Sequence, residues 1–317
     1  MTFSSKASLK HWRQRAAGRL ALVALVLLSA CGGGTSQFDP FIAGRVFAFG
    51  DDLSTLTSNG RKFAVNGLNA DGQVDCSLEP LWVQQVAGFY GYVFAQCNPG
   101  NTGTVNAFMF AAAGAKVAEV AVQVDAQVAA GGFRDKDLAL VLGGMNDVLE
   151  LYAQFPARSE ASLLAEIRAR GERLALIVNR LIDLKAKVVV SMVPDMGLSP
   201  FAIAQDRLNP GRAALLTRLV TAFNEQLGVK VLLDGRFVGL MQTDLRTQLI
   251  ARFPGSYGFT EVTKGACNVA LPACTTATLI TNATAGGYFW ADDTRLASGG
   301  QGQLTSLAIE RVQGNPF

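Results

Sequence analysis

Short apolar runs alternate with longer amphipathic runs from about residue 45 to the end of the sequence. The runs "RVFAFG" (45–50), "DLALVLGG" (137–144) and "KVVVSMVP" (187–194) are almost continuously apolar, as expected for strands buried on both faces. Residues 160–185 and 212–227 instead carry apolar side chains every three or four positions, which predicts helices with one buried face. Strands that alternate with helices in this way predict an α/β fold with a mainly parallel central sheet.

Further elements and the domain limits follow from the same patterns. We expect another strand in "KVLLDG" (230–235), a short apolar run in "GYFW" (287–290) and a closing helix over residues 302–312. The chain has 317 residues, half of them apolar, which is enough to bury a substantial core. The sequence has no internal repeat and no interior linker, so residues 45–317 are predicted to form a single domain.

The first thirty residues have the composition of a signal peptide. Five basic residues and no acidic residue precede and flank the apolar run "LALVALVLLSA" (20–30), which is shorter than the ~20 apolar residues of a membrane span. Its end, "LSAC" (28–31), resembles the lipobox of bacterial lipoproteins, in which the cysteine becomes the acylated first residue. We therefore expect removal of residues 1–30, lipidation of Cys31 and a flexible tether within residues 31–44. An ordinary secretory signal with a chance cysteine is the alternative.

The resemblance to a lipoprotein signal implies a location. It predicts a protein held at the bacterial cell envelope by an N-terminal lipid anchor, with the membrane as its first partner. Gly32 follows the cysteine, whereas an aspartate at that position favours retention at the inner membrane of enteric bacteria. For a Gram-negative source, an outer-membrane location facing the periplasm or the surface is therefore expected.

The charge of the remaining chain excludes one class of partner. The formal net charge of +3 comes from 28 basic and 25 acidic residues, and five of the basic residues lie in the signal segment. The mature chain thus has 23 basic against 25 acidic residues, a net charge of about −2. No block of like charge and no interleaving of basic and aromatic residues remains, so no nucleic-acid partner is expected.

The cysteines favour disulfides over a metal site. Four remain besides Cys31, and two fall in each of two irregular insertions, 57–106 and 254–286. An even number in an exported chain favours two disulfides, for which three connectivities are possible. Pairing of nearest neighbours is our prediction: Cys76 with Cys97, and Cys267 with Cys274. A metal site is disfavoured because the only histidine, His11, lies in the signal segment.

Three expected strand ends carry polar residues after apolar runs: "FGDDLS" (49–54), "GGMNDV" (143–148) and "WADDTR" (290–295). In doubly wound sheets, sites form beyond the carboxyl ends of the strands. In this order the three segments resemble the blocks of the SGNH or GDSL family of ester hydrolases and lipases. The resemblance implies a flavodoxin-like SGNH-hydrolase three-layer sandwich and covers about residues 45–312.

The resemblance fails at two positions that carry the family's chemistry. In the first block, Asp52 stands where the family has its nucleophilic serine. The third block is intact and supplies Asn146, whereas the best match to the second block's oxyanion glycine is Gly114. The last block keeps its aspartate, Asp292, but Arg295 replaces the histidine base. The resemblance therefore implies five site positions of which two are degenerate.

The two replacements make sense as a pair. An acid and a guanidinium at the positions of serine and histidine predict a hydrogen-bonded ion pair between Asp52 and Arg295. The second oxygen of Asp52 is expected in the oxyanion hole, where backbone amides and Asn146 are placed to bind a negatively charged oxygen. Asp51 is expected to be structural, and Ser54 to satisfy backbone donors in the first helical turn rather than to act as a nucleophile.

Two functions remain open at this stage. One is a lipoprotein with an esterase fold that has lost catalysis and acts in binding or in a structural role. The alternative is a divergent GDSL-type hydrolase of carboxylic esters or of acylated lipids or glycans, using Asp52 or a water held by it. Neither requires a cofactor or a metal. The family resemblance implies an acyl ester or a glycan as ligand, whereas the sequence itself indicates neither the ligand class nor a protein partner nor the oligomeric state.

Overall fold

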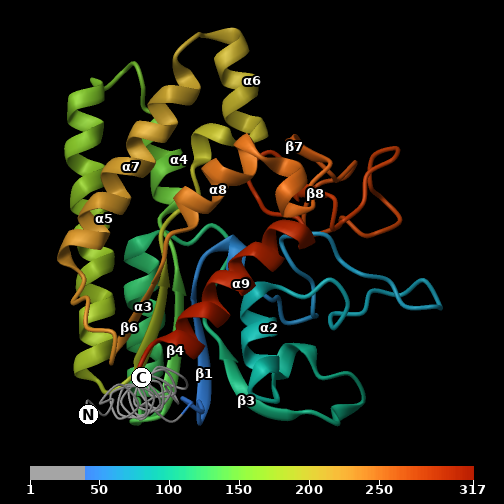
Figure 1. The fold of residues 1–317 in the computed structure, drawn as a ribbon, viewed down its shortest axis with the longest axis vertical. Helices are drawn as coiled ribbons and strands as arrows, with labels where there is room; N and C mark the ends of the chain where they lie inside the picture. Colours follow the sequence, from blue (N-terminus) through green and yellow to red (C-terminus); the bar gives the residue numbers. More distant parts are fainter. Residues whose placement is uncertain (1–39) are drawn as a thin grey trace, which may run out of the picture. The chain divides into compact units, whose positions relative to one another are not determined.

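The computed structural model describes residues 40–317 (Figure 1). The expected signal peptide (1–30), the expected lipidation site Cys31 and most of the expected tether lie outside the described residues. The compact unit begins at Pro40, five residues before the domain start expected from the sequence. Ala43 is buried and its carbonyl accepts a hydrogen bond from the Tyr92 hydroxyl at 2.9 Å, so these residues already belong to the folded domain.

A six-stranded sheet forms the centre of the domain, and all its neighbouring strands are parallel. Its spatial order is β2-β3-β1-β4-β5-β6. The strands are β1 (Arg45–Gly50), β2 (Tyr92–Phe94), β3 (Thr104–Met109), β4 (Asp137–Leu142), β5 (Lys187–Ser191) and β6 (Val238–Met241). Without the edge strand β2, this is the flavodoxin-like order, and the predicted fold class is confirmed.

Helices cover both faces of the sheet and complete three layers (Figure 1). One layer contains α3, α5 and α7, and the other contains α2 and α9. The helices are α2 (Trp82–Phe89), α3 (Val117–Ala129), α4 (Met145–Tyr152), α5 (Glu160–Asp183), α6 (Pro200–Leu208), α7 (Arg212–Lys230), α8 (Thr243–Arg252) and α9 (Ser298–Gly314). Within residues 40–317, none of these helices combines the length and the apolarity needed to cross a bilayer.

The sequence placed one strand incorrectly and missed three others. The strand expected at 230–235 is wrong, because α7 continues to Lys230 and β6 begins only at Val238. Leu232 and Leu233 are exposed in the connecting loop, so their apolar character does not reflect burial in the sheet. Strand β2 and the start of β3 lie in the first segment expected to be an irregular insertion, and β7 (Glu261–Gly265) lies in the second.

The remaining elements extend or refine the expectations. The apolar run near 288 forms β8 (Tyr288–Trp290), which pairs in parallel with β7 (Glu261–Gly265) in a small sheet of its own. The predicted disulfide pairing is confirmed: Cys76 is bonded to Cys97, and Cys267 to Cys274. Each bond closes a short loop within one of the two insertions, so both insertions are held locally.

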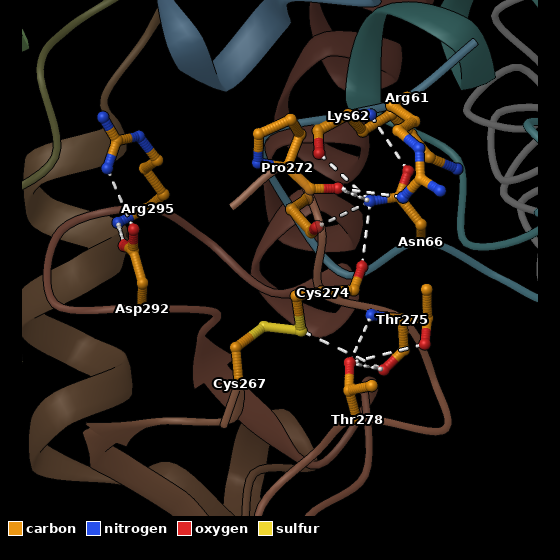
Figure 2. The surroundings of a disulfide bond; sticks show 11 residues. Arg61, Lys62, Asn66, Cys267, Pro272, Cys274, Thr275, Thr278, Asp292 and Arg295 are labelled. Atoms are coloured by element: carbon orange, nitrogen blue, oxygen red, sulfur yellow. Dashed lines mark hydrogen bonds and ion pairs between the residues drawn. A yellow bond between two sulfur atoms is a disulfide. The ribbon is translucent and has the colours of Figure 1, made fainter. Parts of the chain in front are cut away.

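The insertions are also joined to each other by Asn66, which is buried (Figure 2). Its side-chain amide donates to the carbonyls of Pro272 at 3.0 Å and Cys274 at 2.9 Å, and its carbonyl oxygen accepts the Lys62 amide at 2.9 Å. Asn66 thus connects the segment after β1 to the disulfide loop near the end of the chain. The same end of the chain carries Asp292 and Arg295.

Gly50 ends β1 in a conformation that other residues adopt only with strain. Its φ is +139°, and a Cβ there would lie 1.8 Å from the Leu142 carbonyl oxygen. The buried Gln123 of α3 accepts the Gly50 amide at 2.8 Å and donates to its carbonyl at 2.9 Å. Gly50 and Gln123 therefore fix the direction in which the chain leaves β1, and with it the position of the next two residues.

Replacing Gly50→Ala is expected to abolish folding or to lower the free energy of unfolding by at least about 4 kcal/mol, because the added Cβ meets backbone that cannot move aside. Urea unfolding followed by circular dichroism measures this. Gly255→Ala is the matched control, since a Cβ there meets nothing within 4 Å, and it is expected to change stability by less than about 0.5 kcal/mol. A Gly50→Ala protein as stable as the control would contradict the assigned geometry of this turn.

Candidate active site

The acids that follow β1 have different surroundings. Asp51 caps the short 3₁₀ helix Asp52–Ser54, and its Oδ1 accepts the Leu53 amide at 3.1 Å. Asp51 is fully buried, and its other oxygen has no hydrogen-bond partner among the described residues. Burial, and next the charge of Asp52, raise the pKa of Asp51 well above its ordinary value. Asp51 is thus a structural residue with a strong preference for the neutral form.

One oxygen of Asp52 lies where two donors from different strand ends converge. Its Oδ2 accepts the Gly114 amide at 2.8 Å and the Asn146 side-chain amide at 2.9 Å. Gly114 follows β3, and Asn146 lies in the first turn of α4, directly after β4. Asn146 also donates to the Ala115 carbonyl at 3.0 Å, which orients its amide group. These are the two positions that the family resemblance assigned to the oxyanion hole.

The other oxygen of Asp52 forms the predicted ion pair. Its Oδ1 accepts hydrogen bonds from Nε of Arg295 at 2.9 Å and lies 2.9 Å from Nη2. The remaining nitrogen of the guanidinium, Nη1, donates to Asp292 at 2.9 Å, as Figure 2 shows. Arg295 therefore lies between two carboxylates, and the guanidinium also lies over the Phe63 ring, 5.8 Å from its centroid.

Asp292 holds its loop as well as the arginine. Its Oδ1 accepts the backbone amides of Thr294 at 2.9 Å and Arg295 at 2.7 Å. A hydrogen bond from the Phe201 amide of α6 to the Asp293 carbonyl, 3.0 Å long, holds the loop against that helix. The backbone that carries Arg295 is therefore held in place, which limits the positions that its side chain can adopt.

Asp52 and Arg295 stabilise each other's charge, and Asp292 is a second carboxylate beside the same guanidinium. Burial by itself raises the pKa of Asp52, but hydrogen bonds from Asn146 and Gly114 and the charge of Arg295 outweigh it and lower that pKa overall. Burial likewise lowers the pKa of Arg295, whereas the charges of Asp52 and Asp292 raise it above its ordinary value. Both partners are therefore ionised at neutral pH. Only 1% of the Asp52 side chain is exposed, against 28% of that of Arg295.

Ser54 has a different role from the one expected. It is buried, and its hydroxyl accepts the indole N–H of Trp82 at 3.1 Å instead of backbone donors in the helical turn. Gln301 links α2 to α9 beside this contact, since it accepts the Trp82 amide at 3.0 Å and donates to the Leu53 carbonyl at 3.2 Å. The expectation that Ser54 satisfies backbone donors is therefore wrong, because its hydroxyl binds the Trp82 side chain instead.

Two further acids support the site without entering it. Asp147, next to Asn146, accepts the Val117 amide at 2.9 Å and a hydrogen bond from the guanidinium of Arg170 at 3.2 Å, which hold the start of α4 against α3 and α5. Asp195, in the "VPDMGLSP" segment after β5, accepts the Gly197 amide at 3.0 Å and the side-chain amide of Gln248 at 3.0 Å. Both acids therefore act as structural links between strand ends.

The sequence did not identify several residues that shape the site. They are Phe63, Trp82, Gln123 and Gln301. Gln123 and Gln301 could have been noticed as polar residues on otherwise apolar helix faces. Their hydrogen-bond partners, however, come from segments far away in the sequence. Within residues 40–317, no three His, Cys, Asp or Glu side chains are grouped as metal ligands would be.

The fold and the site together define a class of protein. It is a three-layer α/β domain with a parallel central sheet, in which side chains from several strand ends meet around the Asp52 carboxylate. Residues 46–293 match the model of the GDSL-like lipase/acylhydrolase family, and the chain belongs to that family. No curated protein sequence is similar enough to count as a match.

The chain is similar in fold to solved structures of lipolytic proteins and of an acetylxylan esterase. A lipase from a goat rumen metagenome is 14% identical, with 86% of this chain and 99% of that chain covered and a TM-score of 0.49. An acetylxylan esterase from Geobacillus stearothermophilus is 16% identical, with 86% and 96% covered and a TM-score of 0.40. A lipolytic protein of the G-D-S-L family from Veillonella parvula is 13% identical, with 84% and 96% covered and a TM-score of 0.42.

The neighbours Asp51 and Asp52 are expected to affect stability in opposite ways as the pH changes. Because the folded-state pKa of Asp51 is raised, wild-type protein loses stability as the pH rises from about 3.9, the unfolded value, through that raised pKa. Asp51→Asn has no carboxyl at this position and does not lose this stability. The free energy of unfolding of the variant minus that of wild type is therefore expected to increase from about pH 3 to about pH 7.

Asp52→Asn is expected to show the reverse trend. The folded-state pKa of Asp52 is lowered, so its contribution is present above about pH 3.9 and is lost as the pH falls through the lowered value. The variant should be less stable than wild type by about 1–3 kcal/mol at pH 7, and by less near pH 3. Urea unfolding at several pH values measures both variants, with Asp71→Asn as the control for loss of an exposed acid. Parallel pH trends for Asp51→Asn and Asp52→Asn would show that their environments are not the ones described.

Proposed function

We propose that this protein has retained the GDSL fold but no longer hydrolyses esters, and that it acts in binding or in a structural role at the bacterial envelope. The observation that carries the proposal is the position of the Asp52 carboxylate. Its Oδ2 accepts the Gly114 and Asn146 donors that would stabilise an oxyanion, and its Oδ1 binds Arg295. A substrate carbonyl would have to displace a buried, ionised side chain from all three partners.

The chemistry of the group supports the same proposal. Ester hydrolysis of the family type needs a hydroxyl nucleophile and a base that takes its proton. Arg295 stays protonated because its pKa lies above an already high ordinary value. The only histidine of the chain, His11, lies in the expected signal segment. Neither role is therefore filled at the positions where the family fills them.

The divergent-hydrolase alternative requires Asp52 to attack or to hold a water. Attack by the carboxylate on an ester would form a mixed anhydride, whose hydrolysis calls for a base. Asp52 is 1% exposed and its lowered pKa makes it a weak base, so the geometry favours the non-catalytic function.

The location is part of the proposal. The signal-like segment and its "LSAC" motif support a lipid anchor at Cys31, and two disulfides are typical of an exported domain. In a Gram-negative source this corresponds to the outer membrane. The ligand class suggested by the family is an acyl ester or an acylated glycan, bound without turnover.

Restoring the family residues is expected to restore the chemistry. Wild-type protein should show no burst and no turnover of p-nitrophenyl acetate, butyrate or octanoate above the uncatalysed rate. Asp52→Ser combined with Arg295→His should hydrolyse at least one of these esters, whereas each single variant should not. The double variant supplies the nucleophile and the base, and Asp292 is already placed to orient the new imidazole.

The control for the restored activity is Asn146→Ala in the double variant, which should lower the rate about 100-fold or more by removing one oxyanion donor. Turnover by wild-type protein that Asp52→Ala abolishes would refute the loss of catalysis. A double variant that folds but stays inert with all three esters would refute the equivalence of Asp52 and Arg295 with the family's serine and histidine.

A further inference from the structure

The chain enters the described domain at the edge where the parallel strands begin. Phe41 packs edge-on against Tyr90, and also against Phe317 at the end of the chain, with ring centroids 6.1 and 5.4 Å apart. The Gly44 amide donates to the Lys136 carbonyl at 2.7 Å, just before β1 and β4 start side by side. Any anchor that precedes Pro40 is therefore connected to the amino edge of the sheet.

Large apolar side chains are exposed along this edge. They precede or follow the strand starts and are between 48% and 75% exposed: Ile42 before β1, Phe89 before β2, Val229 in the last turn of α7, and Leu232 and Leu233 before β6. Three separate connections contribute these side chains, namely those that lead into β1, β2 and β6. Because β1 is an inner strand and β2 and β6 are the two outer strands, the apolar side chains are spread along the whole amino edge.

The same edge carries excess positive charge. Arg134 and Lys136 precede β4, Lys185 precedes β5, and all three are exposed and make no ion pair within residues 40–317. Lys187 begins β5 and donates to the Arg236 carbonyl at 2.9 Å. The unpaired acids among these connections are Asp135 and Asp183, whereas Asp137 and Asp234 are paired with arginines. The edge is therefore basic although the mature chain as a whole is slightly acidic.

The candidate site lies at the opposite edge. Asp52 follows the carboxyl end of β1, and six strand residues separate it from the connections before Arg45, a span of about 20 Å. Gly114, Asn146 and Arg295 lie with Asp52 at this far edge. A surface that contacts the amino edge leaves the site open on the other side of the domain.

We infer that the amino edge rests on an anionic lipid bilayer, so that the domain holds its site away from the membrane. The edge combines exposed apolar side chains with basic ones, which is how peripheral surfaces bind acidic headgroups. The inference rests on the proposed lipid anchor for the proximity of the membrane: eight residues lie between Cys31 and Pro40, and a connection of this length spans up to about 30 Å when extended. The anchor therefore attaches at this edge, and the exposed apolar and basic side chains of the edge turn it toward the bilayer.

Photo-crosslinking in cells tests the orientation with the full chain. The crosslinking amino acid p-benzoylphenylalanine is placed at Leu233 on the amino edge or, as the matched control, at Leu208, which is 74% exposed on α6. After irradiation, mass spectrometry is expected to find phospholipid adducts at position 233 and at least about fivefold fewer at position 208. Adding Lys136→Glu and Lys185→Glu should lower the lipid adducts at position 233 by a similar factor, because both changes repel acidic headgroups.

The outcomes separate this inference from the proposed anchor. Acylation of Cys31, read from the same mass spectra, tests the anchor. An acylated chain with no lipid adduct at position 233, or with equal adducts at both positions, would overturn the orientation alone. Adducts at position 233 to protein in place of lipid would assign the edge to a protein partner and also overturn it. An unacylated chain would refute the anchor, and lipid adducts confined to position 233 would then still support the lipid-binding edge.

Discussion

The ion pair between Asp52 and Arg295 determines what the site can do. Its members are 243 residues apart in the sequence and join the end of β1 to the loop before α9. The carboxylate of Asp52 uses one oxygen for Arg295 and the other for Gly114 and Asn146. In the function that we propose, this one side chain occupies both the nucleophile position and the oxyanion position of the family, and Asp292 is a second carboxylate on the same arginine.

The rest of the fold presents that carboxylate in a fixed place. Gly50 allows the chain to turn sharply beside Leu142, and Gln123 binds both backbone groups of Gly50. Asp51 then caps the short helix that contains Asp52, at the cost of burying a carboxyl with one unpartnered oxygen. Gly50, Gln123 and Asp51 thus fix the backbone from which the Asp52 side chain reaches its partners.

Features set by local pattern could be predicted from the sequence. Strands β1, β4 and β5 are continuous apolar runs, and α5 and α7 show a clear helical period. Strand β3 was missed because exposed and half-buried residues interrupt it, and the false strand at 230–235 arose because apolar residues there are exposed rather than buried. A run of apolar residues predicts a buried strand only where the fold buries those residues. The prediction fails where the apolar side chains are exposed, as they are in residues 230–235.

The site was predictable in part for a different reason. The contacts of Asp52 with Arg295, Gly114 and Asn146 were expected because two replaced motif positions carried opposite charges and the fold brings strand ends together. The partner of Ser54 was not expected, since Trp82 lies in a helix of an insertion that carries no sequence motif. Long-range polar contacts of this kind depend on packing details that no local pattern records.

The most direct test of the central claim is the amide signal of Gly114 in solution. In a pH titration followed by ¹H–¹⁵N NMR, the Gly114 amide proton is predicted to shift with an apparent pKa below the ordinary aspartate value, because its acceptor is the Asp52 carboxylate. In Asp52→Asn that transition should disappear. A Gly114 amide that does not titrate, or that titrates equally in both proteins, would contradict the placement of Asp52 in the oxyanion position.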